Sequence, residues 1–208
     1  EVVQNLEEHF HTKYSYHKGK GRIGNGIIVK GENKIKNTYT HPSIISTLRD
    51  RYYEAAIVDI PGDKDLLVVS LHLYTKASED QVSQIDEYPD VAKFIHSILN
   101  EGDYYVAVGG DFNSSTNYYV NYYWNSMLAT DITYPRDQNG NFKTNASRRR
   151  HYDWILVDKK FQEFSVPTQI GSQTFPNGYV LDSRVHSPLS EISPVEYDDS
   201  DAPNMQHM

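Results

Sequence analysis

The stretch Gly109-Gly110-Asp111-Phe112-Asn113-Ser114-Ser115 constrains this chain more than any other. The apolar, β-forming run before it, from Tyr104 to Val108, predicts a buried strand. Two glycines then allow a sharp turn, and a carboxylate and a carboxamide follow two positions apart. Residues i and i+2 of an extended backbone point to the same side, so Asp111 and Asn113 can converge at the end of this strand. An Asx turn is the structural alternative, because the same residue types favour it.

The composition bounds the class of protein. The chain has 208 residues, of which 38% are hydrophobic, so it can bury a substantial core. The sequence contains neither an internal repeat nor a linker, and we expect one domain. It contains no cysteine, which excludes disulfides, a thiol nucleophile and a cysteine-ligated zinc. The 17 tyrosines favour a β-rich, secreted bacterial protein, although the composition leaves the compartment open.

The charge pattern limits how nucleic acid could bind. A net charge of −8 argues against binding through bulk charge, but it permits a nuclease with a local basic surface and metal ions. Seven basic residues and one acidic residue lie between Lys13 and Lys36, and three arginines stand at 148–150. Each segment predicts either a phosphate-attracting rim or a solvated face.

Hydrophobic periodicity predicts the secondary structure. The clearest helix runs from Tyr88 to Asn100, with Pro89 in its first turn, and it connects two strands as a crossover. The first of these strands, 66–71, forms a hairpin with 51–61 and ends at His72. The other expected elements are helices at 2–10 and 117–128, strands at 24–29 and 152–157, a strand pair at 180–189, and loops at 134–145 and 190–203.

Three motifs appear in an order and spacing that resemble a known family. They are Ser70-Leu71-His72-Leu73, then Gly109-Gly110-Asp111-Phe112-Asn113, then Arg150-His151-Tyr152-Asp153-Trp154-Ile155-Leu156. The pattern resembles the endonuclease/exonuclease/phosphatase superfamily with the deoxyribonuclease-I-like fold. The resemblance covers nearly the whole chain. It implies an α+β fold, a four-layer α/β/β/α sandwich of two mixed β-sheets, in a single domain (1–208) that lacks the family's first and last strands.

The resemblance also implies roles for the strand-end residues. His72 looks like the phosphate-contacting histidine of the nuclease branch and a candidate general acid. Asp111 is similar to the residue that orients the attacking water or touches a metal. Asn113 would bind a non-bridging phosphate oxygen, and Arg150 would contribute to substrate binding.

A carboxylate–histidine pair and a metal ligand complete the implied site. Asp153 looks like the carboxylate that fixes the catalytic histidine, His207, by setting its tautomer and stabilising its imidazolium form. Glu1 looks like the carboxylate ligand of Mg²⁺ or Mn²⁺, hard cations that take oxygen ligands. Gln206 departs from the family's Ser-Asp-His pattern, and this substitution puts a second metal site in doubt.

The expected function is a divalent-metal-dependent phosphoester hydrolase. We expect a monomeric nuclease without a stable protein partner that cleaves nucleic-acid phosphodiesters with little sequence preference. One alternative is a lipid or small-molecule phosphoesterase, such as a sphingomyelinase or an inositol-phosphate phosphatase. An exposed aromatic hairpin at the cleft rim would favour lipid, and 118–124 is the candidate segment. The other alternative is a non-catalytic binding module on the same fold.

Overall fold

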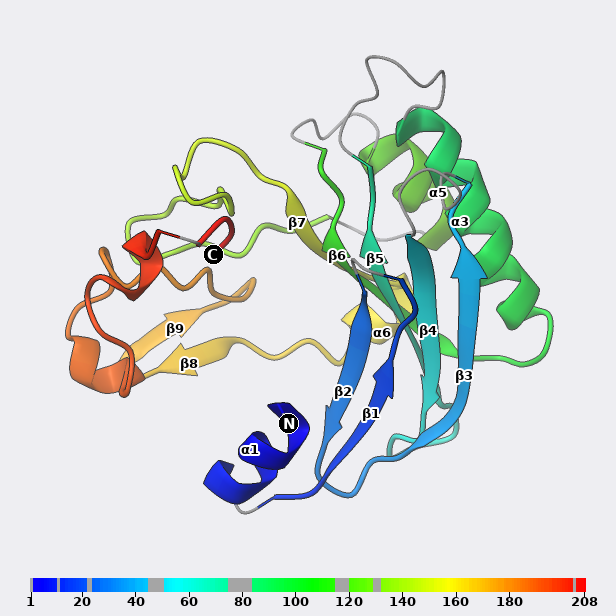
Figure 1. Ribbon diagram of the computed structural model, residues 1–208, viewed down its shortest axis with the longest axis horizontal. Coiled ribbons are helices and arrows are strands. Elements are labelled where there is room, and N and C mark those ends of the chain that lie inside the picture. Colours follow the sequence, from blue (N-terminus) through cyan, green and yellow to red (C-terminus); the bar gives the residue numbers. More distant parts are fainter. Residues whose placement is uncertain are drawn as a thin grey trace.

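A five-stranded mixed sheet forms the centre of the computed structural model, which describes residues 2–10, 12–21, 24–44, 51–74, 84–114, 120–128, 132–203 and 205–208 (Figure 1). The strand order is β3-β4-β5-β6-β7. The strands are β3 (Ile35–Pro42), β4 (Tyr52–Val58), β5 (Leu66–His72), β6 (Tyr105–Asp111) and β7 (Asp153–Val157). All neighbours are antiparallel except β5 and β6, which run parallel.

The hairpin and the crossover are confirmed. In the hairpin of β4 and β5, Glu54 pairs with Ser70. Helix α3 (Gln84–Leu99) connects β5 to the parallel strand β6. It begins four residues before the predicted start at Tyr88, so the placement of Pro89 in the first turn was wrong. Pro89 lies inside the helix, where it lacks the N–H that would bond the preceding turn.

The helical side of the sheet carries the main hydrophobic core. Helix α3 buries Val91, Ile95 and Ile98 against the alternate residues of β5. The rest of this layer is the π-helix η1 (Val120–Trp124) with α5 (Asn125–Leu128), which confirms the predicted helix for 120–128 and leaves 117–119 outside the described residues. The Trp124 ring is fully buried, 5.3 Å from the ring of Phe112. This packing fixes the residue that follows Asp111.

A two-stranded antiparallel ribbon, β1 (Tyr14–Lys18) with β2 (Gly26–Lys30), packs on the opposite face. The second strand confirms the prediction for 24–29. Ile27 of the ribbon packs on Ala56 and Val58, and the buried Glu54 carboxylate accepts from His17 Nε2 at 2.8 Å. Among the described residues the mixed sheet is single. Where two mixed sheets were expected, the second layer is this short ribbon, with α1 (Val2–Phe10) bonded to its edge.

Residues 132–208 mostly form an irregular lobe beside β7, on the side of the sheet away from β3 (Figure 1). The predicted strand pair at 180–189 was wrong: Tyr179 makes one isolated bridge to Arg136, and the following residues turn around the buried Asp182. Asp182 bonds the guanidinium of Arg184 and pairs with that of Arg148. These ionic contacts take the place of the hydrogen-bond ladder that a strand pair would have formed. The loop predicted at 134–145 is confirmed.

The remaining elements of this lobe are short. They are α6 (Lys159–Gln162), a hairpin of β8 (Thr168–Ile170) and β9 (Gln173–Phe175), and the 3₁₀ turns η2 (Leu189–Ile192) and η3 (Asp199–Asp201). The loop predicted at 190–203 contains η3 and all of η2 except Leu189. In the part of the chain that the structure describes, no helix has the length and apolar character needed to span a bilayer.

Gly110 lets β6 approach β5 at the end of the sheet. Its φ is +138°, and an added Cβ would overlap the carbonyl oxygen of Leu71. We therefore expect Gly110→Ala to lower the free energy of unfolding by at least ~2 kcal/mol, measured by urea denaturation. Gly62→Ala is the matched control, because Gly62 has a φ of +131° and open space around it. Equal losses of unfolding free energy in the two variants would show that backbone strain, and not the contact with Leu71, explains the need for glycine at position 110.

Candidate active site

Three strand ends bring polar side chains together on the ribbon side of the sheet. His72 is the last residue of β5, Asp111 is the last of β6 and Asp153 is the first of β7. The register pairs His72 with Asp111 and Asp111 with Asp153, so the three lie in one row across the sheet. Directly opposed residues on neighbouring strands place their side chains on the same face. The three motifs, which lie far apart in the sequence, therefore meet at one end of the neighbouring strands.

His207 reaches this row from the end of the chain. Backbone bonds hold its segment along 144–146: Ala146 N donates to Gln206 O at 2.8 Å, and Met208 N donates to Thr144 O at 2.7 Å. The Thr144 hydroxyl also accepts from the backbone N–H of Asp153 at 3.0 Å. One short segment thus positions both members of the predicted carboxylate–histidine pair. Gln206 contributes its backbone here, while its side chain is exposed.

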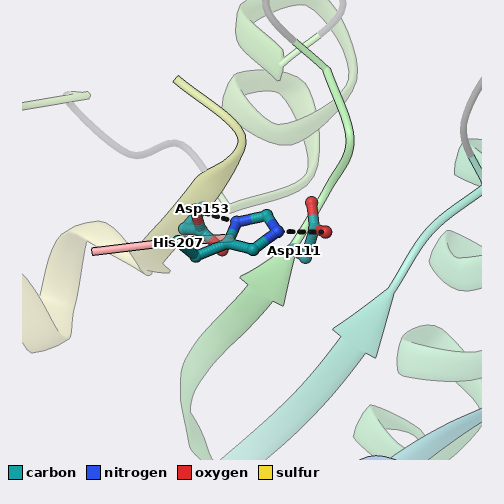
Figure 2. A group of neighbouring side chains, drawn as sticks. All are labelled: Asp111, Asp153 and His207. Atoms are coloured by element: carbon teal, nitrogen blue, oxygen red, sulfur yellow. Dashed lines mark hydrogen bonds and ion pairs between the residues drawn. The ribbon is translucent and has the colours of Figure 1, made fainter. Parts of the chain in front are cut away.

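The His207 ring stands between two carboxylates (Figure 2). Its Nδ1 lies 2.8 Å from Asp153 Oδ2, and its Nε2 lies 3.5 Å from Asp111 Oδ2. His72 Nε2 lies 3.6 Å from the same oxygen of Asp111. An ionised carboxylate only accepts hydrogen bonds, so Asp153 selects the His207 tautomer that carries hydrogen on Nδ1. In the neutral ring Nε2 is then a free acceptor that faces Asp111.

Burial shifts two ionisation equilibria in this row. Desolvation raises the pKa of Asp111, and the nearby Asp153 charge raises it further, against the opposing hydrogen bond from Asn113 N–H. Desolvation lowers the pKa of His72 to about 4, helped by the positive charge of Arg51. His72 is therefore neutral near pH 7, where it offers one N–H and one acceptor nitrogen.

Asn113 lies next to Asp111, but not through an extended backbone as the sequence suggested. Its φ is +50°, and its N–H donates to Asp111 Oδ1 at 2.7 Å in an Asx turn. Its Nδ2 donates to the carbonyl oxygen of Leu73 at 2.8 Å. The turn that was the structural alternative is thus present, and it fixes the Asp111 carboxylate beside the strand end.

Arg51, which the sequence reasoning missed, supports the end of β5. Its side chain is buried, and Nη1 donates to the carbonyl oxygens of His72 at 3.1 Å and Leu73 at 2.6 Å. The Leu73 carbonyl is the one that Asn113 also contacts, so Arg51 and Asn113 share an acceptor. An arginine just before an apolar strand was the available signal. From the sequence alone such an arginine is interpreted as a surface cation, because its acceptors lie at the end of the neighbouring strand β5.

The arginine triplet divides between two environments. Arg148 exposes only 10% of its side chain and pairs with Asp137 and Asp182, so it is not part of a cleft edge. Arg149 and Arg150 are exposed. The guanidinium of Arg150 donates to the Tyr152 hydroxyl at 3.3 Å, and the Tyr152 ring lies 6.4 Å from that of His207. Arg150 therefore stands at the rim of the site without a described contact to the row.

The predicted metal ligand and one basic residue lie elsewhere. Glu1 is outside the described residues, so its role stays a prediction. Lys36, in the basic segment that begins at Lys13, pairs with Asp59 and Asp65 near the start of β5, at the opposite end of the sheet from His72. This part of the segment does not contribute a rim to the site.

The donor atoms at the strand ends suit a single divalent cation. Ligand atoms of Asp111, Asp153 and His207 all lie within 4.8 Å of one another. Carboxylate oxygens are the ligands that Mg²⁺ and Mn²⁺ favour. Asp153 is already bonded to His207, so Asp111 is the described residue best placed to hold such an ion.

Comparison with known proteins gives matches only among solved structures. No family model and no curated protein matches the sequence. The catalytic domain of human nocturnin, solved with bound sulfate, is 15% identical, with a TM-score of 0.58 over 76% of this chain and 65% of that one. SmcL is 16% identical, with a TM-score of 0.53 over 84% of this chain and 71% of that one. An endonuclease/exonuclease/phosphatase family protein from Leptotrichia buccalis is 19% identical, with a TM-score of 0.50 over 76% of this chain and 65% of that one.

These likenesses establish the fold. The chain has the deoxyribonuclease-I-like fold, which the resemblance of the three motifs implied. It spans slightly less than two thirds of the nocturnin and Leptotrichia chains. His72, Asp111 and Asp153, which come from the three sequence motifs, lie together at the strand ends of this fold.

The lowered pKa of His72 predicts a pH-dependent stability. The unfolded chain takes up this proton near pH 6.5 and the folded chain near pH 4, so between these values the unfolded state binds more protons. Stability therefore falls as the pH drops from 6.5 toward 4. His72→Asn should remove on the order of 1 kcal/mol of this loss between pH 6.5 and 5, after allowance for solvent screening. Urea denaturation at both pH values measures it, and parallel wild-type and variant curves would contradict the assignment.

Arg51→Met tests the support of the strand end. The substitution leaves the carbonyl oxygens of His72 and Leu73 without this donor and removes the neighbouring positive charge. We expect a loss of roughly 1–3 kcal/mol in stability and a rise in the pKa of His72. NMR titration of the His72 ring measures the pKa. A variant in which that pKa stays near 4 would show that the charge of Arg51 does not contribute to it.

Proposed function

We propose that this chain is a divalent-metal-dependent phosphoester hydrolase that cleaves nucleic-acid phosphodiesters with little sequence preference. The observation that supports this most is the placement of His207, hydrogen-bonded to Asp153 on one side and facing Asp111 on the other. A phosphodiesterase needs a base for the attacking water and donors for the phosphoryl oxygens. His207 supplies the base, and His72 and Asn113 supply the donors, at the ends of neighbouring strands.

His207 is the general base in this proposal. His207 Nε2 and Asp111 Oδ2 lie 3.5 Å apart, which is too close for a water between them, but a water oxygen beside the pair can contact both groups. Nε2 takes the water proton while the water oxygen forms a bond to phosphorus. The bond from phosphorus to the leaving ester oxygen breaks in line, and solvent protonates that oxygen. Asp153 stabilises the imidazolium that results.

His72 and Asn113 bind the phosphate. Neutral His72 donates one ring N–H to a non-bridging oxygen, a role that needs no proton transfer at neutral pH. The Asn113 carboxamide uses one N–H on Leu73 and keeps the other for the phosphate. Arg150, at the rim, provides a positive charge for the neighbouring phosphate of a polymer.

Asp111 and, by the family resemblance, Glu1 would hold the Mg²⁺ or Mn²⁺ ion. When bound, the ion polarises the phosphoryl group and stabilises negative charge on the leaving oxygen. Asp111 serves the cation best as a carboxylate, so its raised pKa predicts that metal affinity begins to fall at a higher pH than it would with an ordinary aspartate.

The lipid alternative loses one of its supporting features. The aromatic segment expected at the cleft rim is a π-helix in its described part, and Trp124 is fully buried in the core. Tyr122 is exposed, but Tyr123 stacks on Tyr88, 5.1 Å between ring centroids.

We further propose that the ribbon β1–β2 and helix α1 represent the second sheet and outer helix layer of the superfamily's four-layer sandwich.

His207→Ala is expected to lower hydrolysis at least 100-fold, because it removes the base that deprotonates water. Nicking of plasmid DNA in Mg²⁺ measures the activity, and a chelator should abolish it. His96→Ala is the matched control: it removes an exposed histidine of α3, away from the strand ends, and should leave the activity unchanged. Equal activity of His207→Ala and the wild type would overturn the mechanism.

A panel of DNA, RNA, sphingomyelin and inositol phosphates tests the substrate class. A metal-replete preparation that leaves both nucleic acids intact but hydrolyses a lipid or inositol substrate would replace the nuclease proposal with the alternative. Metal binding without hydrolysis of any member of the panel would favour a binding module.

A further inference from the structure

Glu87, in the first turn of α3, is a fully buried carboxylate that the mechanism above does not use. A carboxylate in the protein interior costs free energy unless hydrogen bonds replace those that it made with water. Glu87 Oε1 accepts from the hydroxyls of Ser43 at 2.9 Å and Tyr53 at 3.4 Å, and Oε2 accepts from Tyr74 N at 2.6 Å. The side chain therefore connects the helix to β4 and to the chain segments that follow β3 and β5.

The bond from Tyr74 is the one that connects Glu87 to the row of residues at the strand ends. Tyr74 stands two residues after His72, the last residue of β5. Its N–H and the carbonyl group of Leu73 belong to one peptide unit, which is planar and rigid, so the two groups turn together. The same Leu73 carbonyl oxygen accepts from Asn113 Nδ2 at 2.8 Å. Glu87 and Asn113 thus bond opposite ends of a single peptide unit.

Asn113 carries this connection to Asp111. While Nδ2 of Asn113 bonds the Leu73 carbonyl, its backbone N–H donates to Asp111 Oδ1 at 2.7 Å. The other carboxylate oxygen, Oδ2, is the one that lies 3.5 Å from His207 Nε2. A turn of the peptide unit would remove the acceptor of the Asn113 side chain and loosen the bond to Asp111. These contacts form an unbroken chain, so a displacement at Glu87 reaches Asp111.

Arg51 bonds the carbonyl end of the same peptide unit and does not replace Glu87. Its Nη1 donates to the Leu73 carbonyl oxygen at 2.6 Å, but a guanidinium has no acceptor for the N–H of Tyr74. That N–H is buried, and a buried donor that loses its acceptor is strongly unfavourable. Without Glu87 the peptide unit would therefore turn until its N–H reaches water or another acceptor.

We propose that Glu87 is a positioning residue of the active site. It fixes the peptide unit that follows Leu73, and through this unit it fixes Asn113 and Asp111. The inference rests on the proposed function, because Asp111 acts in catalysis only under that proposal. The Tyr74 N–H needs an oxygen acceptor at hydrogen-bonding distance and not a negative charge, so the role belongs to the hydrogen bond.

Glu87→Gln and Glu87→Asp separate the hydrogen bond from the charge. Glutamine loses the charge but keeps the length, so its carboxamide oxygen can accept from Tyr74 N while its NH₂ group donates to the two hydroxyls. Aspartate keeps the charge but is one methylene shorter, which draws the carboxylate away from Tyr74. We expect Glu87→Asp to nick plasmid DNA in Mg²⁺ at least ~10-fold more slowly than the wild type, and Glu87→Gln to stay within about threefold, because small misplacements of catalytic groups are costly.

Tyr53→Phe is the matched control. It removes the hydroxyl that bonds Oε1 of the same carboxylate and leaves the bond from Tyr74 to Oε2, so it should nick DNA at the wild-type rate. The NMR signals of the Asn113 carboxamide, recorded without metal, give a second readout that needs no activity. They should shift toward solvent-exposed values in Glu87→Asp and keep their wild-type positions in Glu87→Gln and Tyr53→Phe.

The outcomes separate this role from general damage to the fold. Glu87→Asp that nicks at the wild-type rate, or that leaves the Asn113 signals unmoved, overturns the proposal. An equal loss of activity in Glu87→Gln assigns the effect to the charge, and an equal loss in Tyr53→Phe assigns it to any weakened contact in this part of the core; either result also overturns the proposal. A wild-type protein that cuts no DNA contradicts the proposed function, and the Asn113 signals then decide the positioning role.

Discussion

The parallel pairing of β5 with β6 is the contact on which the rest of the site depends. It sets His72 level with Asp111, and the following bond from Leu73 N to Asp111 O, 2.8 Å, continues the pairing past the strand ends. Parallel neighbours need a long crossover, which α3 supplies while it covers the core. Gly110 makes the close approach possible, because any side chain there would meet Leu71. A one-residue slip would turn either His72 or Asp111 to the helical face.

The second half of the site is held by polar contacts, since little regular structure is present beyond β7. Thr144 bonds both Asp153 and the backbone of Met208, so it links the carboxylate to the histidine segment. Arg184 connects Asp182 with Asp201 and also donates to the carbonyl of Ala146. Asp182 is buried, so removal of either arginine partner, Arg184 or Arg148, is costly because it leaves an uncompensated charge on this carboxylate. The described part of this lobe has no large apolar core, and these polar contacts give it a defined arrangement.

The sequence predicted those parts of the molecule that follow local rules. Periodicity located α3 and the β4–β5 hairpin. The three motifs pointed to His72, Asp111 and Asp153, and the family resemblance pointed to His207, before any of their contacts were known. The sequence failed where distant partners decide the outcome. The 180–189 segment has β-like residues, but Asp182 turns inward to two arginines. Arg148 likewise looks like part of a basic run in the sequence, and only the structure shows that it pairs with Asp137 and Asp182. Arg51 could not be recognised as a support of β5, because its acceptors lie 21 and 22 residues further along the chain.

Arg148 also has a consequence for how the two halves of the molecule respond to their surroundings. Around its guanidinium, Asp137 accepts the backbone N–H groups of Asn139 and Asn141 in a tight loop, and the Asn141 carbonyl faces the same group. A loop of this kind gathers oxygen atoms around a positive centre, and here that centre is covalently part of the chain. The lobe that carries His207 therefore keeps its own counterion at any concentration of free divalent metal. Under the proposed metal-dependent mechanism, catalysis and architecture would use separate cations. Removal of the metal would then stop hydrolysis at the strand ends and leave intact the contacts that position His207.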